Sequence, residues 1–384
     1  MQYRHNLGGI PTPDDQERQL AEEQEARDTA WRRLCRRTDE IRIIDFHTHT
    51  FPDKIAERAL AQLSRDSGTI PFTDGTAGAL QASMQEAGVD LSVVLPVVTN
   101  PEKVAHVNVT AAKQNCTADE TGILSFAGIH PAAANYRILL DVVKRLGFKG
   151  IKLHPDYYKI PFNDIRTKRV VEYATELDLV VVTHAGTDIG LYPPVYCTVD
   201  SIVDVLMDVR PTKLVAAHMG GWNNWDEVAD KLAGRNVWVD TAFSIGKIPW
   251  IAAEGDPQAA GGPQAAGDPQ TAGEPQAAGD PQAAGGPQAE GTPRGIGDPA
   301  PDKKKYGFRM LSDVAFVQLV YALGVNRVLF ATDSPWAEQK DYVNRISSIP
   351  FTEEEKRKIF AENAKQLLGM PAAKAPSPAG VSEY

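Results

Sequence analysis

Short apolar runs alternate with amphipathic segments along most of the chain from Ile41 onward. The runs hold six or seven residues and are rich in β-branched side chains, a pattern typical of buried strands in a parallel sheet. Between them, apolar residues recur at every third or fourth position, as in helices that cover a sheet; clear examples are 77–88, 135–147 and 312–324. The predicted strands are 41–46, 91–97, 123–129, 148–154, 179–184, 213–218, 237–242 and 327–332.

Eight strands, each followed by a helical segment, predict an α/β protein with a (β/α)8 TIM barrel over residues 41–370. Residues 1–40 form a charged leader, in which 14–38 should be an exposed helix leaning on the barrel. Residues 371–384 are rich in Ala, Pro and Ser and should form a flexible tail. Without the leader, the repeat and the tail, one barrel domain accounts for the rest of the chain.

A six-residue repeat interrupts this order at 255–302, with units such as GDPQAA and GGPQAA. It has Pro and Gly in nearly every unit and almost nothing to bury, so we expect a disordered low-complexity insertion. The insertion lies in the loop after the seventh strand, on the face where barrel active sites form. Two interpretations stay open: a tolerated repeat expansion, or a lid or partner-binding segment.

Net charge, the length of apolar runs and cysteine spacing argue against several classes of protein. The net charge of −10 comes from a mixed surface without a long basic run, which argues against nucleic acid as a partner. The chain shows neither a signal-peptide pattern nor an apolar run near the roughly 18 residues that a membrane helix needs, so we expect a cytoplasmic protein without membrane contact. Its three cysteines are far apart, which indicates neither a disulfide framework nor a thiolate metal site.

Most of the histidines stand at or just beyond the ends of predicted strands. Each one alone could be an ordinary hydrogen-bonded residue, and Asp333, at the end of the eighth strand, could simply form a turn before Ser-Pro. Barrel closure, however, brings the carboxyl ends of all strands around one axis, so their joint placement indicates a shared site. The residues are His47, His49, His154, His184, His218 and Asp333.

This set has the composition of a metal site. His47, His49, His184 and Asp333 would supply three imidazole nitrogens and one carboxylate oxygen to a divalent ion, with Zn²⁺ the first expectation and one position open for water. His218 could then act as a general base or polarise the substrate, and Asp333 could carry a proton to the leaving group.

Four further residues are candidates for substrate binding. Lys152 and His154 alternate along the fourth strand and should share a face, where they could pair with a substrate carboxylate or simply pack. Trp222 and Trp336 follow the sixth and eighth strands and could wall an apolar pocket or fill the core under the loops.

An ordered series of motifs runs from about Ile41 to Leu368, outside the repeat: DFHTHTFPD, GIKLHP, VVTHAG, AAHMGG, ATDSPW and ENAKQLLG. Together they resemble the amidohydrolase superfamily, in particular the branch that contains aminocarboxymuconate semialdehyde decarboxylase. The resemblance implies a mononuclear metal site held by His47, His49, His184 and Asp333, with His218 activating water or polarising the substrate. It also implies a small-molecule substrate and the possibility of a homodimer. In binuclear members of the wider superfamily a carboxylated lysine bridges two ions, and Lys152 stands near that place.

Two reactions fit this site. The first is hydrolysis of an amide, ester or lactone by a metal-activated water, and it is our first expectation because it requires only the metal and its water. The second is non-oxidative decarboxylation of an unsaturated or aromatic acid. A third interpretation is an inactive metal-binding barrel that acts through partners. The sequence does not specify the substrate.

Overall fold

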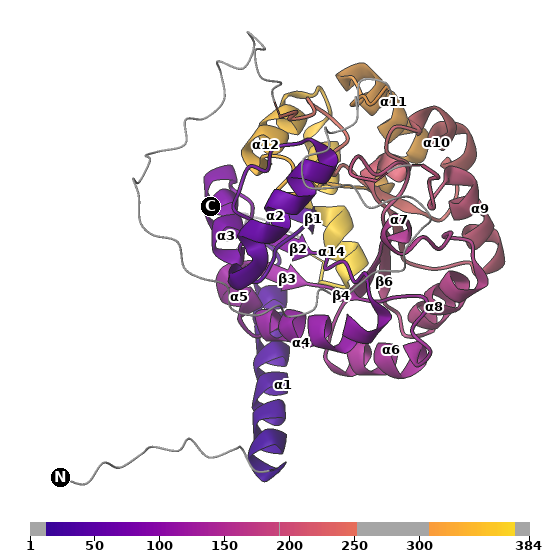
Figure 1. The fold of residues 1–384 in the computed structure, drawn as a ribbon. Helices are drawn as coiled ribbons and strands as arrows, with labels where there is room; N and C mark the ends of the chain where they lie inside the picture. Colours follow the sequence, from indigo (N-terminus) through magenta and orange to yellow (C-terminus); the bar gives the residue numbers. More distant parts are fainter. Residues whose placement is uncertain (1–12, 192, 252–306, 373–384) are drawn as a thin grey trace, which may run out of the picture.

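A computed structural model describes residues 13–191, 193–251 and 307–372, and their centre is a closed parallel barrel surrounded by helices (Figure 1). The predicted disorder of 255–302 lies outside the described residues, as does nearly all of the predicted tail. Within the described ranges no helix is both long and apolar enough to span a bilayer.

All eight predicted strands form in the described residues, and the third is split in two. The strands are β1 (Ile44–Thr48), β2 (Leu91–Val94), β3 (Ile123–Ser125), β4 (Ala127–Gly128), β5 (Gly150–Leu153), β6 (Val180–Thr183), β7 (Leu214–Ala216), β8 (Trp238–Asp240) and β9 (Val328–Leu329). They pair in parallel in chain order, as one run from β1 to β3 and another from β4 to β9.

Backbone hydrogen bonds join the two runs into one barrel. Phe126, between β3 and β4, donates its N–H to the carbonyl of Val94 at 2.9 Å. On the other side, the N–H of Phe46 in β1 bonds to the carbonyl of Phe330 at 2.9 Å, just beyond β9. The first and last strands are therefore neighbours, which confirms the (β/α)8 barrel.

The first strand begins later than the sequence indicates. Apolar residues start at Ile41, but the strand starts at Ile44. The N–H groups of Arg42 and Ile43 instead donate to Oδ2 of Asp90, at 2.6 and 3.0 Å, so a side chain takes the place of a neighbouring strand there.

The predicted helices also form. The leader contains α1 (Pro13–Arg36), which packs on the barrel near its end through buried Ala30 and Leu34, while its first turns project away from the barrel (Figure 1). The other α-helices are α2 (Asp53–Ser67), α3 (Ala77–Ala87), α4 (Val104–Gln114), α5 (Ala118–Thr121), α6 (Tyr136–Arg145), α7 (Pro155–Tyr158), α8 (Ile165–Glu176), α9 (Val199–Asp208), α10 (Trp225–Leu232), α11 (Asp313–Leu323), α12 (Gln339–Ser348), α13 (Glu353–Arg357) and α14 (Asn363–Leu368).

Alternate strand residues divide between two apolar clusters. Phe46, Val182 and Leu329 belong to one cluster, which also includes residues of α14. Their neighbours Val181 and Phe330 belong to the other, which includes the surrounding helices. This alternation is expected of strands that are buried on both faces, and it fixes which residues point toward each side.

Asp45 of β1 links the first and last strands through its side chain. Its fully buried carboxylate accepts hydrogen bonds from the N–H of Thr332 (3.0 Å), the hydroxyl of Thr332 (2.6 Å) and the amide of Gln339 (2.8 Å). A third N–H, from His47, donates to the same carboxylate at 3.3 Å. The residue therefore holds the barrel closed beside the histidines.

We predict that Asp45→Ala lowers the free energy of unfolding by about 4 kcal/mol, because it leaves several buried donors without an acceptor. Chemical denaturation followed by circular dichroism would measure the change. As a control, Asp230→Ala on the exposed side of α10 should change stability by less than about 0.5 kcal/mol. Equal stability of the two variants would contradict the closing role of Asp45.

Candidate metal centre

His47 and His49, at the end of β1, each have Nδ1 held by an oxygen and Nε2 facing the site. Nδ1 of His47 lies 2.9 Å from Oδ2 of Asp240, and Nδ1 of His49 lies 2.9 Å from the carbonyl oxygen of Leu95. The carbonyl requires His49 to carry its proton on Nδ1, which leaves Nε2 as a lone-pair donor. Both Nε2 atoms face Oδ1 of Asp333, at 3.5 Å for His47 and 3.1 Å for His49.

These separations suit a shared cation. Two ligands each about 2.0–2.2 Å from a zinc ion in tetrahedral geometry lie roughly 3.3–3.6 Å apart. Asp333 follows β9 with a φ of 71°, in the left-handed region that non-glycine residues seldom adopt, and such backbone is concentrated at functional sites. The donor atoms of His47, His49 and Asp333 all lie within 4.8 Å of one another, so the three residues fit one divalent ion.

His184 and His218 lie on the other side of the same site. Nδ1 of His218 is 2.9 Å from the carbonyl oxygen of Ala242, so it carries the proton, and Nε2 faces Nδ1 of His184 at 3.0 Å. Nε2 of His184 is buried without a hydrogen-bond partner among the described residues. His184 groups with His154 and Asp188 rather than with the first three residues, so its ligation of the same ion stays a prediction.

Lys152 lies between these groups. Its side chain is fully buried, and Nζ is 2.9 Å from Nε2 of His47. Burial lowers the pKa of Lys152 to about 8, although the carboxylates of Asp240 and Asp333 oppose the shift. With this pKa the amine can lose its proton beside a cation, or keep its proton beside an anion.

Burial also keeps three imidazoles neutral. It lowers the pKa of His47, His154 and His184 well below the ordinary histidine value, and the neighbouring positive charge of Lys152 or of other histidines adds to the effect. Neutral imidazole is the form that binds metal, so the surroundings prepare these rings for ligation without a change in protonation.

Asp240 is a site residue that the sequence analysis did not single out. Its buried carboxylate bonds to Nδ1 of His47 through Oδ2 and accepts the backbone N–H of His218 at 2.8 Å through Oδ1. It therefore orients both histidines at once. Its position at the end of β8, like that of the histidines at their strand ends, was the available signal.

A second carboxylate, Asp188, was also missed. It stands in the loop after β6, and its Oδ2 lies 3.3 Å from Nε2 of His154. The His154 ring stacks on the His184 ring with centroids 4.3 Å apart. The structure thus joins His154 to the histidine cluster rather than leaving it in separate packing.

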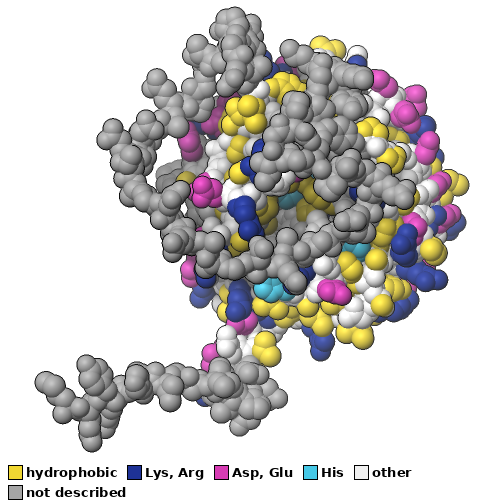
Figure 2. All heavy atoms as spheres, in the orientation of Figure 1, with side chains coloured by type: hydrophobic (Ala, Val, Ile, Leu, Met, Phe, Trp, Pro, Cys, Tyr) yellow, Lys and Arg dark blue, Asp and Glu magenta, His cyan; other side chains and the backbone are white. Residues whose placement is uncertain are grey.

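One cavity of about 750 Å³ contains the whole site. It is lined by every residue that the sequence singled out: His47, His49, Lys152, His154, His184, His218, Trp222, Asp333 and Trp336. Trp222 is buried and anchored by a 2.8 Å hydrogen bond from Nε1 to the carbonyl of Phe243, so it both fills the core and walls the cavity. Figure 2 shows apolar and histidine side chains at the surface of this face.

The fold and the site define a TIM-barrel protein with a histidine and aspartate cluster at the carboxyl ends of its strands. The sequence matches the amidohydrolase family model over residues 44–370, so the chain belongs to the amidohydrolase family, an enzyme superfamily. This confirms the resemblance carried by the motifs. No curated protein matches the sequence.

Several solved structures share the fold at low identity. An uncharacterized TIM-barrel protein, Bb4693, from Bordetella bronchiseptica is 16% identical, with a TM-score of 0.55 over 85% of this chain and 98% of that one. The 2,6-dihydroxybenzoate decarboxylase from Rhizobium is 12% identical, with a TM-score of 0.54 over 85% and 98%. The 5-carboxyvanillate decarboxylase LigW2 from Novosphingobium aromaticivorans, solved with bound manganese, is 13% identical, with a TM-score of 0.52 over 85% and 97%.

Proposed function

We propose that the chain is a metal-dependent hydrolase that acts on a carbonyl group, an amide, ester or lactone, of a small carboxylate-bearing molecule. The observation that carries this proposal is the convergence of Nε2 of His47 and His49 on Oδ1 of Asp333. A divalent ion bound there would polarise the carbonyl and lower the pKa of a water molecule.

The donor set favours zinc, because imidazole nitrogens with one carboxylate oxygen are typical zinc ligands. The manganese in the Novosphingobium decarboxylase makes manganese the alternative. We propose one ion, with His184 as the fourth ligand. Two ions remain an alternative, since Nδ1 of His184 and Nε2 of His218 face each other at 3.0 Å and Lys152 could bridge as a carboxylated side chain.

His218 is the proposed general base. Its Nδ1 proton is held by the carbonyl of Ala242, which leaves a lone pair on Nε2. That nitrogen faces Nδ1 of His184 at 3.0 Å, and His218 lines the cavity. A base held in this tautomer can accept a proton from a water that displaces the His184 contact, with no change of tautomer. Asp333, next to the reacting groups, would take the second proton of the attacking water and pass it to the leaving group, and His218 would release the first to solvent.

Lys152 is the proposed partner of a substrate carboxylate. A buried ammonium group is costly unless it is paired, and the hydrogen bond described for Nζ is to the neutral ring of His47. A carboxylate from the substrate would give Nζ a direct anionic partner, in addition to the nearby carboxylates of Asp240 and Asp333. Lys152 is thereby a binding residue, while His218 and Asp333 carry the proton transfers.

Decarboxylation is the second candidate. The observation that favours it is the same amine, because a carboxylate held at Lys152 lies beside the proposed ion, where the bond to CO₂ could break. The Rhizobium and Novosphingobium proteins of the same fold are both decarboxylases. An apolar cavity would assist loss of the charged group by disfavouring the carboxylate.

A product analysis separates the two reactions. Zinc-loaded and manganese-loaded protein would be incubated in ¹⁸O-labelled water with a panel of esters, amides, lactones and aromatic acids, and the products read by mass spectrometry. Hydrolysis incorporates ¹⁸O into the acid product, and this is the expected result. Release of CO₂ from a panel acid without ¹⁸O in the organic product would replace the hydrolase with the decarboxylase. No turnover of any compound by either metal form would favour the inactive barrel.

A further inference from the structure

We propose that the substrate carries an elongated alkyl or aryl body that extends from the metal centre into an apolar side arm of the cavity, between α2 and α4. This inference rests on the proposed function for the position of the substrate's carboxylate. It goes beyond that function by naming the shape and chemistry of the rest of the molecule.

The side arm is the part of the cavity whose walls come from two helices and the end of β2. Its aliphatic lining residues, several of them small, are Ile55, Ala59 and Leu63 of α2, Val107 and Ala111 of α4, and Val94 of β2. Polar residues of the same helices also line the cavity: Asp53, Gln62, Asp66 and Ser67 of α2, and His106, Thr110 and Gln114 of α4. Val94 and Ala111 are buried in the fold and still line the cavity, so the arm reaches well below the surface.

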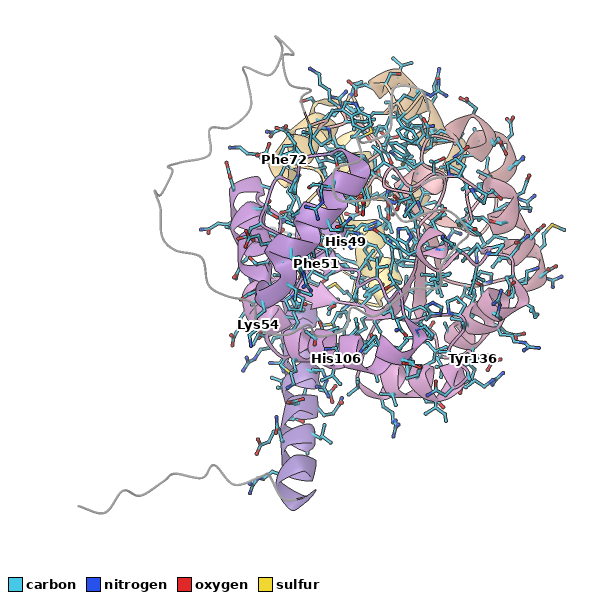
Figure 3. The ribbon with its side chains drawn as sticks, in the orientation of Figure 1. His49, Phe51, Lys54, Phe72, His106 and Tyr136 are labelled. Carbon is cyan, nitrogen blue, oxygen red and sulfur yellow. The ribbon has the colours of Figure 1, made fainter. Side chains whose placement is uncertain are left out.

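The arm is continuous with the metal centre. His49 and the arm residues line the same cavity, and Figure 3 shows His49, Phe51 and His106 in succession from the centre toward α4. The cavity measures about 750 Å³, whereas a cavity of roughly 150 Å³ already holds benzene. A substrate of a single ring would therefore leave most of the space to water, against apolar walls.

Charge fixes which end of the substrate enters the arm. Among the described residues that line the cavity, Lys152 is the one lysine or arginine, and it lies beside His47. On α4 the polar lining residues are His106, Thr110 and Gln114, whereas α2 contributes the carboxylates of Asp53 and Asp66, which would repel an anion. A carboxylate is thus drawn to the centre, and the apolar body is left to the arm.

The partly exposed apolar residues on the outer wall of the arm also support an apolar substrate body. Ile55 is 42% exposed, and Phe51 beside it is partly exposed. An apolar body in the arm would remove this surface from water, and each buried methylene would strengthen binding. Affinity should therefore rise with the length of the apolar body.

The test measures binding rather than turnover. Butanoate, hexanoate and octanoate would be titrated into the zinc-supplemented full chain by isothermal calorimetry, with 1-butanol, 1-hexanol and 1-octanol as an uncharged series. Each added methylene should tighten binding about fourfold. Ala59→Phe and Val107→Phe, which fill the arm from opposite helices, should abolish this gain.

Two matched variants control for the substitution itself. Ala61→Phe on α2 and Val109→Phe on α4 place the same ring on exposed positions outside the cavity, and both should keep the fourfold gain. No gain with length in either series, or a full gain in Ala59→Phe and Val107→Phe, would overturn the side arm. A gain with the alcohols but no binding of any alkanoate would instead support the arm and overturn the carboxylate site of the proposed function.

Discussion

Asp333→Asn is expected to weaken metal binding by more than about a hundredfold and to reduce turnover in proportion. Loss of a residue that merely orients a ligand costs about 10–100-fold in affinity. Asp333 would be a direct ligand, since its carboxylate faces Nε2 of both His47 and His49. Equilibrium dialysis with metal quantification would measure the affinity, and the same samples would give the number of ions per chain.

The control is Asp341→Asn, which makes the same change on the exposed side of α12. Wild-type metal content in Asp333→Asn would contradict the centre as we describe it. About one ion in the wild type would support the mononuclear site. Two ions, together with a carboxylated Lys152 seen by mass spectrometry of the intact protein, would replace it with the bridged arrangement.

His218→Asn is expected to lower kcat by about 10²–10⁴-fold while the protein keeps its metal. The imidazole Nε2 is the proposed proton acceptor, and asparagine can occupy the space without accepting a proton near neutral pH. Kinetics on the substrate identified by the panel, alongside metal quantification, would separate chemistry from binding.

His130→Asn offers a comparison at a histidine that does not line the cavity, and it should change kcat by less than about threefold. Unchanged kcat in His218→Asn would remove His218 from the mechanism. Loss of the metal would show a different role, because His218 also has a ring nitrogen within 4.8 Å of donors on His47 and Asp240 and could be a ligand.

The barrel could be predicted because the same pattern, an apolar run followed by a helical segment, recurs along the chain. Each strand is an apolar run with a helix after it, so an error in one boundary, such as the late start at Ile44, leaves the count intact. That start depends on the carboxylate of Asp90, which is distant in sequence and has no periodic signature.

The sequence indicated which residues gather at the site but not how their side chains are oriented there. Strand-end placement was enough to bring the histidines and Asp333 into one cavity. Which nitrogen faces which partner depends on single hydrogen bonds, such as those to the carbonyls of Leu95 and Ala242. Asp240 was overlooked because a lone carboxylate at a strand end resembles any other turn residue until its partners are known.

The hydrogen bonds of Asp45 that close the barrel can form only after the last strand has been synthesised. Asp45 and Thr332 are 287 positions apart, and His47 and Asp333 are similarly far apart along the chain. At about 5–20 residues per second, synthesis of that interval takes roughly 15–60 s. During this time His47 and His49 lack Asp333, so an ion held by all three residues would enter only after the last strand is made. Such an ion would join the chain's earliest and latest strands and should slow their separation.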